Sequence, residues 1–492
     1  MGNGAMNGDR QGAQAHGAPN GARRVAVVGA GWAGLSAACA LRDRGFDVTV
    51  FEAAHVPGGR ARRVDDGRAA FGAPLDNGQH LLLGAYDATL ALMRRLGIDP
   101  AQALLRLPLR LASADGRFSL RAPRWPAPLH VAAALAGARG LGWRDKLAAA
   151  ALMRTLQRSG WRVAPGQTVA GLWRDTGQTA AVVQWLWLPL CLAALNTPPE
   201  QACAGLFAHV LRDSLGTRRA ASDLLLPRVD LTALWPAAAA RRCTLLAGHA
   251  VRSLVAGPDH AAVDGERFDG AILAVPPYAA ARLLRVLACP TQAAPGTAPA
   301  APASPFPPRA AAAPGEAMST NPQALLAALE DFDYLPIATL TLRLAGPLRL
   351  PEPMMMLCDD PGAGHDGQWV FDRGRLLGLD PAHGELTVVA SAARALADRP
   401  RDDTIRLLQD QLAHQLASHH GIGALPPAIA TELIIDKRAT FAARPGLRRP
   451  GNATPWPRLA LAGDWTDTGY PATLEGAVRS GEAAARHLAA KL

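Results

Sequence analysis

The chain has 492 residues with 49% hydrophobic and 19% charged content, which is ordinary for a soluble globular enzyme of two or three domains. Its net charge is +10, and only three of the 51 basic residues are lysines, so the charge reflects either an arginine-rich, high-GC genome or a preference for anionic surfaces. Six scattered cysteines without C-x-x-C spacing exclude a disulfide framework and a zinc site, and no metal is expected.

No targeting or membrane-spanning segment is predicted. Residues 1–23 are rich in glycine, alanine and asparagine and lack the apolar core of a signal peptide, so they predict a disordered leader. The most apolar run, Ala181–Leu195, is interrupted by Pro189 and is too short to cross a bilayer. These features predict a cytoplasmic protein that is either soluble or peripheral on the inner face of the plasma membrane.

The first ordered unit has the pattern of a dinucleotide-binding site. A buried apolar strand, Val25–Val28, runs into Gly29-Ala30-Gly31-Trp32-Ala33-Gly34, where the glycines allow a tight turn, close approach of a pyrophosphate, and helix–strand packing. The N-terminus of the following helix offers free N–H groups to phosphates. A second strand, Val48–Phe51, ends at Glu52, which is placed to accept the ribose hydroxyls of an adenosine.

A second glycine loop favours FAD over NAD. Gly58-Gly59-Arg60 lets the chain fold back over a pyrophosphate, with the arginine as a charge-assisted contact that a nicotinamide dehydrogenase does not need. Arg62 and Arg63, which follow, fit either the same loop or an exposed arginine run.

The middle of the chain alternates between helical and strand patterns. Apolar spacing predicts an amphipathic helix over Ala85–Leu96, and Trp125–Asp213 is mostly helical with six tryptophans. Strand patterns follow, and Cys243–Val255 alternates as a strand pair would. The other expected elements are strands at Gly270–Val275, Ala338–Leu344 and Glu385–Ser391 and a helix near Asp403–His419.

The C-terminal segment completes the expected flavin site. An apolar strand, Leu459–Ala462, leads into Gly463-Asp464, and a helix opens near Ala472-Thr473-Leu474. Asp464 is placed to accept a ribityl hydroxyl or to orient a phosphate. The helix N-terminus can stabilise negative charge at the pyrimidine end of a reduced flavin.

Together these elements predict an α/β fold, in which a Rossmann-type FAD-binding domain is interleaved with a substrate domain made of a mixed sheet and a helical subdomain. The expected division is a leader at 1–23, FAD-binding segments at 24–124, 226–288 and 446–492, a tryptophan-rich helical subdomain at 125–225, a disordered Ala/Pro-rich insert at 289–317, and the substrate domain at 318–445.

These motifs resemble the flavin amine oxidase superfamily, which includes phytoene desaturases and protoporphyrinogen oxidase. Within it, three segments are similar to the hydroxysqualene dehydroxylase family of bacterial hopanoid biosynthesis: Leu75–Tyr86, Leu195–Glu200 and Ala462–Thr466. The resemblance runs from about Arg24 to the C-terminus, except for the insert. It implies non-covalent FAD, with further cofactor contacts from Gln79 and Val251. No cysteine follows Cys358 to form a covalent flavin link of the kind found in amine oxidases.

The resemblance implies reductive removal of an allylic hydroxyl from hydroxysqualene to give squalene. Such a reaction needs an acid for the leaving hydroxyl and an apolar pocket, for which the tryptophans are candidate walls, although packing in the core explains them as well. Asp76, Gln79 and His80 belong to the segment that lines the flavin in this superfamily. His80 is the first candidate acid because histidine is protonated near neutral pH, and Tyr470 and Asp76 are further candidates, with a structural role open for each.

The expected partners are a squalenoid lipid, the membrane surface and neighbouring enzymes of squalene and hopanoid synthesis, but no nucleic acid. An apolar entrance around Trp185–Leu195 is the predicted membrane dock. No second strand–GxGxxG–helix unit is present, so NAD(P)H, if it is the external reductant, must reach the flavin directly, or a carrier protein must reduce it. The alternatives are a desaturase or a protoporphyrinogen-type oxidase of the same fold, or a flavin-holding scaffold without turnover.

Overall fold

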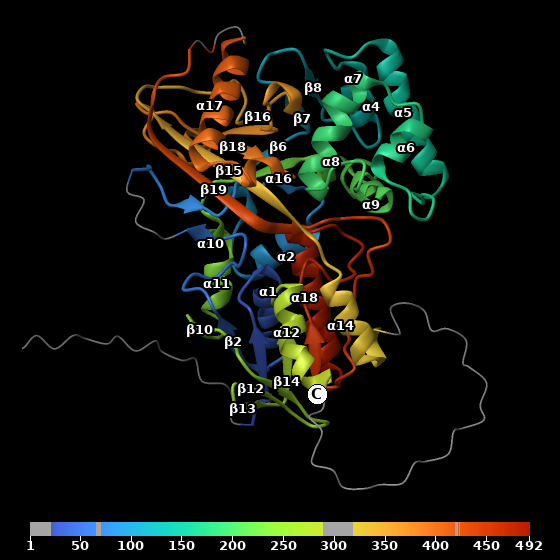
Figure 1. The fold of residues 1–492 in the computed structure, drawn as a ribbon, viewed down its shortest axis with the longest axis vertical. Coiled ribbons are helices and arrows are strands. Elements are labelled where there is room, and N and C mark those ends of the chain that lie inside the picture. The colour runs from blue at the N-terminus through green and yellow to red at the C-terminus, as the bar shows by residue number, and fades with distance from the viewer. Residues whose placement is uncertain (1–20, 65–69, 289–317, 419–421, 423) are drawn as a thin grey trace, which may run out of the picture.

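The computed structural model describes residues 21–64, 70–288, 318–418, 422 and 424–492. Most of the expected leader and the whole Ala/Pro-rich insert lie outside these residues. Figure 1 shows three regions: a parallel sheet between helices in the lower half, an antiparallel sheet at the upper left, and a group of helices at the upper right. The predicted α/β class is confirmed.

Five parallel strands form the sheet of the lower region, in the order β10-β2-β1-β14-β20. Their bounds are β1 Arg24–Val28, β2 Asp47–Glu52, β10 Thr244–Ala247, β14 Gly270–Leu273 and β20 Leu459–Leu461. The central strand is apolar and buried from Val25 to Val28 because other elements cover it, with contacts to helix α1 (Trp32–Arg42) and to strand β13 (Glu266–Phe268) of a small antiparallel sheet. This one sheet therefore joins strands from the beginning, the middle and the end of the chain.

Helix α1 (Trp32–Arg42) is buried from Trp32 to Leu41 between the sheet and helix α18 (Leu474–Ala489). The two helices approach closely because Gly481 of α18 has no side chain: a Cβ there would lie 2.1 Å from the Ala33 carbonyl oxygen. Ser36 Oγ also donates a hydrogen bond to the Val478 carbonyl at 2.9 Å. The last helix of the chain thus packs directly on the helix of the glycine motif.

The upper-left region is an antiparallel sheet in the order β16-β17-β18-β15-β19, covered by α17 (Arg401–Ala417). Its strands are β15 Tyr334–Leu344, β16 Met354–Met356, β17 Trp369–Asp372, β18 Glu385–Ala390 and β19 Ala428–Phe441. Leu408, Leu412 and Leu416 recur once per turn of α17 and are buried in the core that the sheet forms. The strands expected at Ala338–Leu344 and Glu385–Ser391 and the helix near Asp403–His419 are confirmed.

The upper-right region contains the helices of the tryptophan-rich segment, which are α4 Leu129–Ala136, α5 Trp143–Arg158, α6 Val169–Asp175, α7 Ala180–Val182, a π-helical turn at Val183–Trp187, α8 Leu188–Leu195 and α9 Ala204–Leu215. Trp173 and Trp187 pack edge-on against Phe207, and Trp185 stacks on Phe118 at 5.6 Å. These three indoles are buried core residues. The membrane dock expected around Trp185–Leu195 is therefore wrong, because periodicity alone does not distinguish a buried apolar helix from an exposed one.

The predicted strand pair over Cys243–Val255 is also wrong. Strand β10 pairs in parallel with β2, whereas β11 (Leu254–Ala256) belongs to a separate antiparallel sheet with β12 (Ala261–Val263) and β13 (Glu266–Phe268). Alternation in a sequence indicates a strand but does not identify its partner. The amphipathic helix expected over Ala85–Leu96 is confirmed as α2 (Asp87–Arg95).

The remaining described elements are short and connect these regions. They are β3 Arg63–Val64, β4 Leu75–Asp76, β5 Leu82–Leu83, α3 Pro100–Ala103, β6 Leu104–Leu107, β7 Arg110–Ala112, β8 Ser119–Arg121, a 3₁₀ turn at Arg219–Ser222, β9 Leu224–Pro227, α10 Leu231–Leu234, α11 Pro236–Ala240, α12 Pro277–Ala288, α14 Pro322–Glu330, a 3₁₀ turn at Pro361–Ala363, α15 Arg373–Leu377 and α16 Arg394–Ala397.

Candidate functional site

The two glycine loops meet at the carboxyl ends of β1 and β2. The Gly58 N–H donates a hydrogen bond to the Ala30 carbonyl at 2.8 Å. Gly59 has a φ of +63°, and a Cβ there would lie 2.8 Å from the Gly31 Cα. Both the positive φ and the close contact require glycine. The structure thus brings together the two motifs that the sequence presents as separate loops.

The first loop leaves open space beside Gly31. Gly29 has a φ of +110°, and a Cβ on Gly34 would lie 1.9 Å from the Gly29 carbonyl oxygen, so both are needed for the turn itself. A Cβ on Gly31, by contrast, would meet only the Gly59 Cα, at 3.8 Å. Gly31 is therefore not required by packing within the chain. The space beside it, at the N-terminus of α1, is what a bound pyrophosphate needs.

Glu52 holds the first loop through both carboxylate oxygens. Its Oε2 accepts a hydrogen bond from the Ala30 N–H at 2.7 Å, and its Oε1 accepts one from the Ala54 N–H at 2.8 Å. The carboxylate thus lies against the glycine loop at the end of β2, as the spacing predicts. Its contact with an adenosine ribose stays a prediction.

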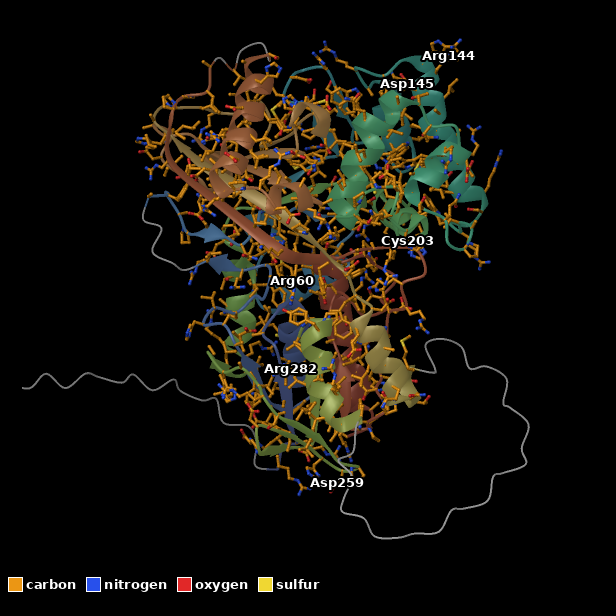
Figure 2. The ribbon with its side chains drawn as sticks, viewed as in Figure 1. Arg60, Arg144, Asp145, Cys203, Asp259 and Arg282 are labelled. Carbon is orange, nitrogen blue, oxygen red and sulfur yellow. The ribbon has the colours of Figure 1, made fainter. Side chains whose placement is uncertain are left out.

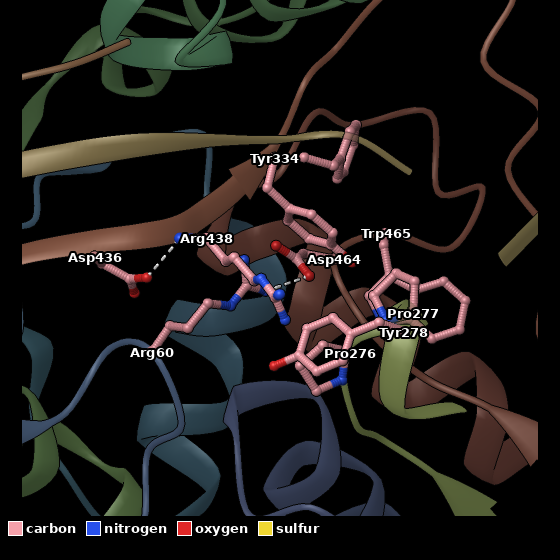
Figure 3. A pocket seen from close by; sticks show the side chains of 10 residues that line it. Arg60, Pro276, Pro277, Tyr278, Tyr334, Asp436, Arg438, Asp464 and Trp465 are labelled. Atoms are coloured by element: carbon pink, nitrogen blue, oxygen red, sulfur yellow. Dashed lines mark hydrogen bonds and ion pairs between the residues drawn. The ribbon is translucent and has the colours of Figure 1, made fainter. Parts of the chain in front are cut away.

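Arg60 connects the second loop to the C-terminal motif. It donates hydrogen bonds to Asp464 Oδ1 and to the Ala439 carbonyl, both at 2.6 Å (Figure 3). Burial alone would lower the pKa of Arg60, but the adjacent Asp464 outweighs burial and raises that pKa above its ordinary value. Asp464 itself is only 7% exposed. Residues 404 positions apart therefore form one charged pair, in which the carboxylate is buried and the guanidinium is partly exposed.

A pocket opens beside this pair, and both charged and aromatic side chains line it (Figure 3). Its lining comprises Arg60, Pro276, Pro277, Tyr278, Tyr334, Asp436, Arg438, Phe441, Asp464 and Trp465. No motif in the sequence marks these aromatic residues. Tyr278 could have been found, because it follows the end of β14, and the carboxyl ends of parallel strands meet at one edge of the sheet.

Arg449 is a second residue that the sequence analysis missed. It is 9% exposed and donates hydrogen bonds to the carbonyl oxygens of Asp464 (2.9 Å), Trp465 (3.2 Å), Thr466 and Tyr470 (2.5 Å). Burial lowers its pKa, although Asp467 and Asp464 oppose that effect. One guanidinium therefore holds the backbone of the loop that presents Asp464. No local motif marks this arginine among the many in the chain.

His80 lies near the charged pair. Its Nδ1 lies 2.8 Å from the Gly78 carbonyl oxygen, which can only accept, so Nδ1 carries the proton and Nε2 is free to accept. Burial lowers the pKa of His80, and the nearby Arg60 lowers it further. The imidazole is therefore neutral near pH 7, which opposes the expected role as an acid and suits a hydrogen-bond acceptor.

Tyr470 lies away from the lining of this pocket. Its hydroxyl donates a 2.6 Å hydrogen bond to Asp213 of α9, and the Arg479 guanidinium lies 5.0 Å from its ring centroid. Burial and the bond to Asp213 raise its pKa well above the ordinary value. A phenol whose proton is held by a carboxylate is a poor acid for a substrate, so its contacts favour a role in joining α9 to the C-terminal loop.

Asp76 accepts a hydrogen bond from the Leu231 N–H at 2.9 Å, at the start of α10. Burial raises its pKa from 3.8 to about 7, and the nearby Asp230 adds to this shift while Arg373 and Arg63 oppose it. Of the three catalytic candidates, Asp76 is therefore the one whose protonation changes near neutral pH.

We expect Asp76→Asn to remove a pH dependence of stability. An unfolded carboxyl ionises near 3.8 and the folded one near 7, so the native state is favoured below pH 3.8, loses stability as pH rises to about 7, and changes no further above that. The amide can still accept from Leu231. Urea unfolding should therefore show that the free energy of unfolding of the variant rises relative to that of the wild type between pH 4 and pH 8. The substitution Asp380→Asn, at an exposed position, should show no such rise. Parallel pH profiles for wild type and Asp76→Asn would contradict the raised pKa of Asp76.

The other predicted cofactor residues have mixed positions. The Thr473 side chain accepts a hydrogen bond from the Gly476 N–H at 3.1 Å and caps α18, whose first residue is Leu474. Ala472 and Gln79 are partly buried. Val251 is buried ahead of β11, where its carbonyl accepts a hydrogen bond from Arg282 at 3.2 Å. Their contacts with a cofactor stay predictions.

Comparisons with known proteins agree over nearly the whole chain. The sequence signature described as "Flavin containing amine oxidoreductase" matches residues 32–489. The chain is 31% identical to a hydroxysqualene dehydroxylase of Rhodopseudomonas palustris and 30% identical to one of Sinorhizobium fredii, each over 94% of this chain and 97% of the relative. The solved structure of cyclohexylamine oxidase from Brevibacterium oxydans matches with a TM-score of 0.60 at 19% identity, over 95% of this chain and 99% of that one, which shows the fold.

Proposed function

The chain belongs to the family of flavin containing amine oxidoreductases, and we propose that it is an FAD-dependent dehydroxylase that converts hydroxysqualene to squalene in hopanoid biosynthesis. The observation that carries this proposal is the extent of the similarity. Relatives of this name match over 97% of their own length. A zeta-carotene desaturase of Capsicum annuum, which represents the alternative chemistry, matches over 35% of this chain.

The geometry of the glycine loops supports FAD binding. We propose that the space beside Gly31 and the N-terminus of α1 receive the pyrophosphate, that Glu52 accepts the adenosine ribose, and that Arg60 and Asp464 contact the phosphate and the ribityl chain. When bound in its reduced form, FAD supplies the hydride for the reaction. We further propose that the helix N-terminus at Thr473 and Leu474 faces the flavin ring, with Gln79 and Val251 as additional contacts.

The overall reaction needs a hydride and a proton: the carbon–oxygen bond breaks, the hydroxyl leaves as water, and hydrogen replaces it. We propose that neutral His80 orients the substrate hydroxyl through the free Nε2. Asp76 is the first candidate for holding the proton, since its pKa of about 7 keeps part of it protonated at neutral pH. Tyr470 stays the third candidate.

The direct test is anaerobic incubation of the purified, chemically reduced protein with hydroxysqualene, followed by lipid extraction and mass analysis. We expect squalene to form together with an equal amount of oxidised flavin, which is measured by its visible absorbance. His80→Gln should keep its flavin and form squalene more slowly. Unchanged substrate over a flavin that stays reduced would contradict the dehydroxylase.

The same preparation separates the alternatives. A desaturase or a protoporphyrinogen-type oxidase would instead reduce oxidised FAD when given a polyene precursor or a protoporphyrinogen. A non-catalytic scaffold would bind FAD and react with none of these substrates. Adding NADH or NADPH to the oxidised protein tests whether a nicotinamide reduces the flavin directly.

A further inference from the structure

The outer end of the helical region exposes large apolar side chains. Nine such side chains are exposed among the described residues, and four of them lie on or just before α4 and α5. They are Trp125 (56% exposed), Leu129 (57%), Trp143 (68%) and Leu147 (60%). Single exposed apolar side chains are common on protein surfaces. Several large ones in one short part of the chain indicate a surface that binds a partner.

Three of the four side chains lie on α4 and α5, and Trp125 lies in the segment that leads into α4. Leu129 is the first residue of α4, and Trp143 and Leu147 are one turn apart on α5. The two helices touch where Lys146 Nζ donates a 2.7 Å hydrogen bond to the Ala136 carbonyl at the end of α4. Arg144, which lies at the outer tip of this region in Figure 2, has its guanidinium 5.3 Å from the Trp143 ring centroid. We call this set of residues, with the basic side chains around it, the α4–α5 surface.

The charge of this segment is strongly one-sided. Residues 116–174 contain ten basic side chains and one acidic one, a net charge of +9 in a chain whose net charge is +10. The single acid, Asp145, accepts hydrogen bonds from the Gly142 N–H and Thr179 Oγ1 and so serves the start of α5. Arg117 pairs with Asp115 and Arg121 with Glu352, but in the described part of the chain the other eight basic residues form no ion pair. A genome-wide bias toward arginine does not explain why the excess gathers in one segment.

We propose that the α4–α5 surface docks on the face of an anionic phospholipid bilayer. Indole rings prefer the interface between headgroups and acyl chains, leucine prefers the acyl chains, and unpaired arginines attract anionic headgroups. A nucleic acid would use the charge but not the exposed leucines. None of the helices in the described part of the chain combines the length and the hydrophobicity that a membrane span needs. This proposal does not depend on the proposed reaction.

The test is sedimentation of the full-length FAD-loaded protein with vesicles of phosphatidylcholine, either alone or with about 30% phosphatidylglycerol. We expect the wild type to partition about tenfold more strongly to the anionic vesicles at low salt, and this preference should shrink at about 1 M salt because charges are then screened. The double variant Trp143→Ser/Leu147→Ser should bind the anionic vesicles about tenfold less tightly. Arg144→Gln/Arg154→Gln should lose mainly the preference for anionic over neutral vesicles.

Matched controls use exposed residues elsewhere. Val255→Ser/Val286→Ser removes apolar side chains that are 53% and 72% exposed, and Arg241→Gln/Arg486→Gln removes two exposed charges, so both variants should bind as the wild type does. All substituted side chains are exposed, and thermal unfolding verifies that each variant folds. The proposal is overturned if the wild type does not bind anionic vesicles, if the Trp143/Leu147 variant binds them unchanged, or if the surface instead retains a single-stranded RNA and no vesicle.

Discussion

Replacing Gly31 with alanine should remove FAD and leave the fold intact. Gly31 has ordinary extended backbone angles, with φ −72° and ψ 176°, that any residue adopts. The added methyl group would meet only the Gly59 Cα, at 3.8 Å, an ordinary van der Waals contact. The same methyl group stands where we propose that the pyrophosphate approaches the N-terminus of α1. We expect the flavin content, measured by absorbance per polypeptide, to fall more than about tenfold while the thermal midpoint of the apoprotein stays unchanged.

Alanine substitutions at two other glycines serve as controls for Gly31→Ala. Gly451→Ala adds a methyl group that meets nothing within 4 Å, so flavin content and stability should both stay as in the wild type. Gly59→Ala forces alanine into a φ of +63° with its Cβ 2.8 Å from the Gly31 Cα, so it should destabilise the apoprotein itself. A Gly31→Ala protein that purifies with one FAD per chain would refute the phosphate site.

Replacing Arg449 with alanine should destabilise the protein by about 3–5 kcal/mol, because four carbonyl oxygens lose a charged donor inside the structure. The loop from Asp464 to Tyr470 would lose the group that holds its backbone, and a cavity would open beside Phe441, whose ring centroid lies 5.0 Å from the guanidinium. We expect urea unfolding to show this loss, and flavin content to fall with it, since the same loop presents Asp464 to Arg60.

The adjacent arginine is the natural control. Arg448 is exposed and forms no ion pair among the described residues, so Arg448→Ala should change the free energy of unfolding by less than about 0.5 kcal/mol. Arg449→Lys keeps the charge but not the planar fork that reaches several carbonyls, so it should recover only part of the stability. Equal stability of Arg448→Ala and Arg449→Ala would show that the carbonyl cluster does not depend on this guanidinium.

The flavin frame could be predicted because each part of it has a local signature. Gly29 and Gly58 adopt a positive φ, and Gly34 lies against another backbone segment, so each position requires glycine. These glycines therefore occur at fixed distances in the sequence from the neighbouring strand and helix, and that spacing is recognisable. The catalytic candidates have no such signature. Burial lowers the pKa of His80 and raises the pKa of Asp76, because it penalises the charged form of each side chain. The degree of burial is a property of the whole fold and cannot be predicted from a local motif.

Short-range spacing and backbone freedom specify the parallel sheet, the two glycine loops and FAD as the cofactor, so these features can be predicted from the amino-acid sequence. The packed fold, in contrast, sets which charges meet and which apolar residues are exposed. It paired Arg60 with Asp464, placed Arg449 under the C-terminal loop, buried Trp185 and left Trp143 in solvent. Contacts between residues hundreds of positions apart depend on how helices and sheets pack, and neither composition nor periodicity records that packing.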